Sequence, residues 1–127
     1  MSLIWIALGG ALGAVSRHLA VIGAGRAFGP GFPSGVLLVN VAGSFAMGLA
    51  AALLLERAGP GTGAGRFAPF VLAGFLGGFT TFSAFSLDFA RLWEAGRLGA
   101  AALYAGGSVM LSLLALFAGL ALGRAAA

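Results

Sequence analysis

A short run of small, hydroxylated and aromatic residues, Gly-Gly-Phe-Thr-Thr-Phe-Ser at 77–83, has the composition of a site where a helix breaks. It lies within an uncharged stretch, 67–87, that is long enough to cross a lipid bilayer. Glycine, threonine and serine are weak helix formers, and every backbone N–H and C=O inside a bilayer needs a partner within the protein. A break here therefore predicts a bound ion or a polar pathway.

Polar side chains also lie within two other apolar stretches. Asn40 is an isolated amide that either bonds a neighbouring helix or donates an N–H to an anion, and the first role is favoured by the residue alone. Tyr104, Ser108 and Ser112 are spaced by four, so they share one stripe of a helix. Their hydroxyls can donate to a passing anion, or each serine can satisfy a carbonyl of its own helix. Three hydroxyls in register favour a polar track.

Aromatic and basic residues near these positions have two interpretations as well. Phe79, Phe82 and Phe85 recur every third residue, which usually indicates packing in lipid or in the core. Ring edges carry positive partial charge, however, so a small anion can meet them. Arg17 near the end of the first apolar stretch either snorkels to the interface or raises the anion concentration at a vestibule.

The elements that must position these residues are four apolar helices. The chain is 61% hydrophobic and only 8% charged, which is typical of an integral membrane protein. We expect a single all-α transmembrane domain over 1–127, with Gly/Pro-rich connectors at 23–33 and 59–63. We expect the first helix to be retained rather than cleaved, because no basic segment precedes it and it runs into Arg17 and His18. The predicted helices are 3–22, 34–55, 68–95 with a break at 78–82, and 98–123.

Composition excludes several classes of function. The chain has no cysteine and one histidine, so disulfides, a metal cluster and a nucleophile with an adjacent base are not expected, and the chain is not predicted to be an enzyme. The net charge of +4 comes from scattered arginines rather than a basic block, so nucleic acid is not an expected partner. The middle of each predicted helix is without a carboxylate, unlike proton-coupled exporters such as the small multidrug resistance transporters.

The arginines are divided almost evenly between the two predicted sides of the membrane. Such a balance selects no orientation by the positive-inside rule, so either Arg17 is too deep to count or the chain inserts both ways up. Arg57, Arg66 and Arg124 lie on the side of the termini, and Arg17, Arg26, Arg91 and Arg97 lie near the other.

Small residues recur at the spacing of close helix contacts. The pairs are Gly9 with Gly13, Gly74 with Gly78, and Gly119 with Gly123, although 23 glycines also produce such pairs by chance. Four thin helices enclose no large cavity, so we expect an oligomer. The sequence has no internal repeat, and a two-fold arrangement therefore requires a second chain.

Three segments together resemble the Fluc (CrcB) fluoride channels: the glycine-rich 9–17, the Asn40-containing 35–44, and 74–83. The resemblance covers essentially the whole chain, and the combination of the last two motifs is highly specific. It implies a passive channel that exports cytoplasmic fluoride across the inner (plasma) membrane of a prokaryote and confers fluoride resistance. It also implies an antiparallel, dual-topology homodimer with two pores, which would explain the balanced arginines.

The resemblance further implies roles for individual residues. Backbone carbonyls of Gly77 and Thr80 from both subunits would hold a structural sodium ion at the dimer axis, Asn40 would donate its amide N–H to fluoride, and two phenylalanine rings would present their edges. The implied partners are fluoride, the lipid bilayer and a second copy of the chain. The implied fluoride pathway comprises Asn40, Thr81, Phe82, Ser83, Phe85, Tyr104, Ser108 and Ser112, with Arg17 near a vestibule. The competing hypotheses are a small-multidrug-type exporter and a structural subunit of a larger complex.

Overall fold

The computed structural model describes residues 2–59 and 63–126, and all regular structure in these ranges is helical. Residues 60–62, within the predicted connector at 59–63, lie outside the described residues. Two segments are π-helical, Ala52–Arg57 and Pro69–Leu76, and Gly63–Phe67 is a 3-10 helix. The elements are α1 (Ser2–Phe28), α2 (Ser34–Ala51), η1 (Ala52–Arg57), η2 (Gly63–Phe67), η3 (Pro69–Leu76), α3 (Gly77–Phe79), α4 (Ser83–Glu94) and α5 (Leu98–Ala125).

Four stretches of the described chain are long and apolar enough to cross a membrane. The third of them is built from η2, η3, α3 and α4 in succession, so it is the least regular. The prediction of an all-helical chain with four potential membrane spans is confirmed. The stretches are Leu3–Phe28, Ser34–Arg57, Gly63–Glu94 and Leu98–Ala125.

The first helix continues past the predicted end at residue 22. Gly23 and Gly25 remain helical, because a glycine lowers helix propensity without forcing a break. The helix ends at Phe28, and the next residue, Gly29, has a φ of +80°, the left-handed conformation that glycine adopts readily. The N–H of Gly29 donates to the carbonyl of Gly25 at 2.9 Å and closes the last turn.

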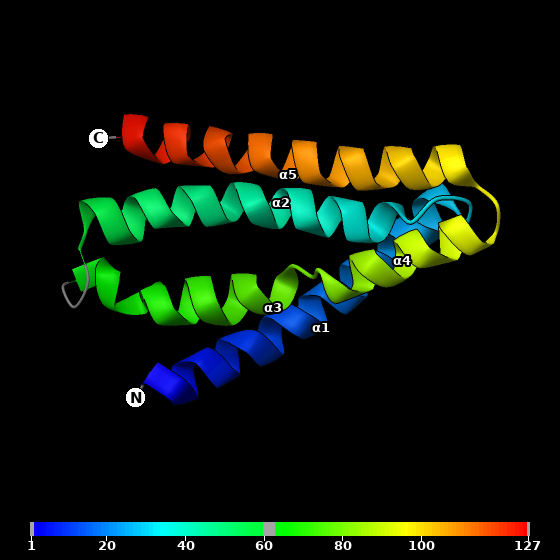
Figure 1. The fold of residues 1–127 in the computed structure, drawn as a ribbon. Coiled ribbons are helices and arrows are strands. Elements are labelled where there is room, and N and C mark those ends of the chain that lie inside the picture. Colours follow the sequence, from blue (N-terminus) through cyan, green and yellow to red (C-terminus); the bar gives the residue numbers. More distant parts are fainter. Residues whose placement is uncertain (1, 60–62, 127) are drawn as a thin grey trace.

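Helices α2 and α5 lie side by side, while α1 crosses the third stretch at an angle (Figure 1). Glycines let the α2 and α5 backbones touch. A Cβ atom on Gly48 would collide with the carbonyl of Leu116, and one on Gly119 would collide with the carbonyl of Phe45. This contact fixes how α5 presents its polar stripe to α2.

Glycines also set the contact between α1 and the third stretch. A Cβ atom on Gly9 would lie 2.6 Å from the carbonyl oxygen of Phe70, and one on Gly78 would lie 2.6 Å from that of Gly10. The spacing of small residues thus reports true interfaces here. Because α1 holds Gly78 this closely, the segment that leads into the break is fixed against a long helix.

Candidate functional site

The third stretch breaks one turn after Gly77. Helix α3 ends at Phe79, Thr80 is extended with φ −87° and ψ 157°, and α4 begins at Ser83. The Thr80 N–H still donates to the carbonyl of Leu76 at 3.1 Å, so the helix runs further into the motif than the predicted break at 78–82. The observed break occupies 80–82.

Asn40 on α2 fills the gap in the hydrogen bonding of this broken helix. Its Nδ2 donates to the carbonyl of Thr81 at 2.9 Å, and the Thr81 N–H donates to its Oδ1 at 2.8 Å. The amide therefore bonds both polar groups of one backbone residue, as a neighbouring strand would. One N–H of the Asn40 amide remains for another acceptor, since no further partner is found within 2–59 and 63–126.

The hydroxyl of Thr81 supplies the next missing bond. It accepts from the backbone N–H of Ala84 at 3.1 Å and so caps the start of α4. The Oγ atoms of Thr81 and Ser83 are 3.4 Å apart. Thr81 is 9% exposed, and this burial protects the hydrogen bonds of its hydroxyl group from competing water.

A hollow of about 490 Å³ opens beside the break. It lies between α2, the broken segment, α4 and α5, and its lining contains no charged side chain. Gly43, Ser44 and Met47 complete the α2 side and had not been predicted as site residues. The structure brings together most of the predicted site residues around it: Asn40, Gly77, Thr80, Thr81, Phe82, Phe85, Ser108 and Ser112.

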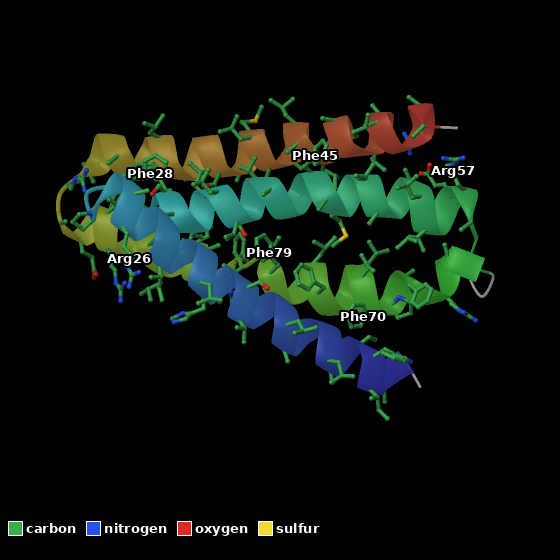
Figure 2. All side chains as sticks on the ribbon, turned by 180° about the vertical axis from the view of Figure 1, so that it is seen from behind. Arg26, Phe28, Phe45, Arg57, Phe70 and Phe79 are labelled. Atoms are coloured by element: carbon green, nitrogen blue, oxygen red, sulfur yellow. The ribbon has the colours of Figure 1, made fainter. Side chains whose placement is uncertain are left out.

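The three phenylalanines of the motif are in different environments. Phe82 is 78% exposed at the hollow, and its ring centroid lies 5.5 Å from that of Phe85. Phe79 instead stacks on Phe75 at 6.0 Å and faces α2 (Figure 2), where a Cβ atom on Gly43 would lie 3.2 Å from its ring. Only Phe82 and Phe85 therefore line the hollow.

The three hydroxyl residues on α5 also differ in environment: two line the hollow and one does not. Ser108 and Ser112 line the hollow, and the buried Oγ of Ser108 has no hydrogen-bond partner in the described chain. Tyr104 is fully buried behind Phe85, and its hydroxyl donates to Oδ2 of Asp88 at 3.1 Å. Sequence reasoning missed this role of Asp88, because the two residues lie on different helices and no spacing links them.

Besides Tyr104, two other predicted residues lie outside the hollow. Ser83 is exposed at the first position of α4, and its hydroxyl lies 3.4 Å from that of Thr81. Arg17 is half-buried on α1 and is not part of the lining.

Four potential membrane spans, with a broken helix beside a hollow that has no charged side chain in its lining, indicate a small multi-pass membrane protein. Residues 4–120 match the family described as CrcB-like protein, Camphor Resistance (CrcB), and the chain belongs to that family. This membership confirms the resemblance seen in the sequence motifs.

Curated relatives carry the name of a fluoride-specific ion channel, FluC. The chain is 53% identical to that of Cereibacter sphaeroides (strain ATCC 17029 / ATH 2.4.9) over 120 residues, covering 94% of this chain and 92% of the relative. It is 56% identical to that of Paracoccus denitrificans over 119 residues, covering 94% and 91%. The family consists of ion channels, so the prediction that the chain is not an enzyme is confirmed.

Proposed function

We propose that this chain is a passive, fluoride-selective channel. The observation that carries the proposal is the buried Ser108 hydroxyl, which has no protein partner in the described chain and lines the same hollow as Asn40 and Phe82. The relatives named as fluoride-specific channels support fluoride as the ion.

The chemistry of the hollow suits a small, strongly hydrated anion. Hydroxyl and amide groups at Ser108, Ser112 and Asn40 can donate to fluoride while remaining neutral. The edges of the Phe82 and Phe85 rings add positive partial charge. Neutral groups replace part of a hydration shell without holding the ion as tightly as arginines would, so the ion can leave.

We extend the proposal to an antiparallel homodimer with two pores. The hollow lies open on one face of the single chain, and Phe82 there is 78% exposed, so a second copy would close the site. Arginines such as Arg26 and Arg57 lie at opposite ends of the bundle (Figure 2), which suits insertion in both orientations.

A structural sodium ion is part of the proposal, and the residues present fit it. The carbonyls of Gly77 and Thr80 would normally accept from the N–H groups of Thr81 and Ala84 in an unbroken helix. Those N–H groups donate to side chains instead, so within the described chain neither carbonyl accepts a helical hydrogen bond. Unwound carbonyls of this kind are ligands for sodium. When bound between two subunits, the cation would join their broken segments by its charge.

The proposed physiological role is the export of cytoplasmic fluoride through the inner membrane of a bacterial cell. A passive channel needs no coupling group, and the lining of the hollow contains no carboxylate that could carry a proton. The competing exporter of the small multidrug type requires such a group, so this observation favours the channel.

Fluoride efflux from liposomes that contain the purified protein is therefore expected to be electrogenic and independent of a proton gradient. Efflux measured with a fluoride electrode should stop when no counter-ion can move, and it should start when a potassium ionophore is added. Collapsing or reversing the proton gradient should leave the rate unchanged. A rate that requires the proton gradient would favour the exporter.

The balanced arginines predict that the chain inserts in both orientations in roughly equal amounts. Adding arginines to the connector at 59–63 should fix one orientation and impair dimer formation when that variant is expressed alone. Single cysteines introduced near each end of the cysteine-free chain, labelled in intact cells, report the orientation. Labelling from one side only in the otherwise unmodified protein would contradict the prediction.

A further inference from the structure

We infer that Asn40 and Thr81 are positioning residues for the cation site. Their side chains accept hydrogen bonds from the backbone N–H groups of Thr81 and Ala84, which would otherwise donate to the carbonyls of Gly77 and Thr80. The inference rests on the proposed function, which places sodium on those carbonyls. It gives Asn40 and Thr81 a role that is separate from contact with fluoride.

The first half of this arrangement belongs to α2. In an unbroken helix the Thr81 N–H would donate to the carbonyl of Gly77, four residues earlier. It donates to Oδ1 of Asn40 at 2.8 Å, and the Asn40 Nδ2 in return holds the Thr81 carbonyl at 2.9 Å. These paired bonds keep the backbone of Thr81 turned toward α2 and leave the Gly77 carbonyl without its helical partner.

The second half belongs to the hydroxyl of Thr81. The N–H of Ala84 would donate to the carbonyl of Thr80 if the helix continued. It donates to Oγ1 of Thr81 at 3.1 Å instead, and Thr80 is extended with ψ 157°. One residue thus frees both carbonyls, the first through its backbone bond to Asn40 and the second through its side chain.

The two residues whose carbonyls are freed lie beside open space. Gly77 and Thr80 line the hollow, and Gly77 is exposed on its open face. Thr81, by contrast, is 9% exposed, so its bonds are not easily replaced by water. If a side-chain acceptor is lost, the released N–H can return to its carbonyl, and sodium must then compete with that hydrogen bond.

The test is the sodium dependence of the melting temperature of the purified dimer, with N-methylglucamine replacing sodium at constant ionic strength. Thr81→Val keeps the shape of the side chain and removes the acceptor. The sodium midpoint is the concentration that gives half of the full rise in melting temperature. One extra hydrogen bond in each of two subunits should raise this midpoint roughly tenfold or more. Thr81→Ser retains the hydroxyl and should match the wild type. Asn40→Leu, which frees the Thr81 N–H, should show a similar rise.

A double variant should restore the sodium response that Thr81→Val weakens. Thr81→Val combined with Ala84→Pro has no N–H at residue 84 that could return to Thr80, and proline is tolerated in the first turn of a helix. The sodium midpoint should move back toward that of the wild type. Thr81→Ala is measured in the same way should Thr81→Val not fold.

Each result has a definite meaning. A melting temperature of Thr81→Val that falls equally at all sodium concentrations, with an unchanged midpoint, overturns the inference and leaves the cation site in place. A wild-type dimer that does not respond to sodium overturns the inference together with that site. Neither result depends on fluoride flux, so the proposed channel activity is judged separately.

Discussion

Asn40→Asp is expected to abolish fluoride flux while the dimer remains assembled. The substitution places a carboxylate at the hollow, on the proposed path of an anion. At an effective dielectric constant of ~20, like charges ~4 Å apart repel by about 4 kcal/mol. That repulsion corresponds to a rate reduced by roughly three orders of magnitude. The measurement is fluoride efflux per reconstituted dimer, with size-exclusion chromatography reporting assembly.

The hydrogen bonds of Asn40 require a matched control. An ionised aspartate still accepts from the Thr81 N–H but cannot donate to the Thr81 carbonyl, so the variant also loses one bond. Asn40→Leu removes both bonds without adding charge, and its flux should fall less than that of Asn40→Asp. An assembled Asn40→Asp dimer with wild-type flux would mean that Asn40 serves only to join α2 to the broken helix.

Replacing either Phe82 or Phe85 with isoleucine should reduce fluoride flux roughly tenfold or more, equivalent to ~1.4 kcal/mol in the barrier. The substitutions approximately keep side-chain volume, so packing alone would predict a mild effect. They remove the electropositive ring edges that line the hollow. Methionine should be tolerated in part, because its side chain is polarizable and adaptable.

Phe79 is the matched control from the same motif. Its ring stacks on Phe75 and packs toward Gly43 outside the hollow, so Phe79→Ile should conduct at near the wild-type rate once folded. Flux is measured per folded dimer for the three isoleucine variants. Near-wild-type rates for both Phe82→Ile and Phe85→Ile would show that the two rings serve packing rather than permeation.

Much of this architecture follows from local sequence. The break is predictable because the segment 77–83 combines residues that form helices poorly, and the structure is extended at Thr80 within it. The α1 and α5 contacts are predictable from glycine spacing, since only a residue without a side chain allows the backbone approach seen at Gly9 and Gly119. The spacing of Ser108 and Ser112 likewise predicts one polar face.

The pairings between helices are not predictable in this way. Periodicity indicates which face a residue occupies but not which group lies opposite, so the bonds from Asn40 to Thr81 and from Tyr104 to Asp88 emerge only once the helices pack. The same limit explains why Tyr104 shares a stripe with Ser108 yet is buried behind Phe85. The end of α1 lies beyond the predicted residue 22, because the sequence alone does not distinguish Gly23 from Gly29. Of these two glycines, only Gly29 has a positive φ.

The most direct test of the proposed function is anion efflux from liposomes that hold the purified wild-type protein, with fluoride and chloride measured under the same driving force. The hollow with its neutral donors and ring edges predicts fast fluoride efflux and little chloride efflux above that of protein-free liposomes. Equal efflux of the two anions, or no fluoride efflux from a folded dimer, would contradict a fluoride-selective channel.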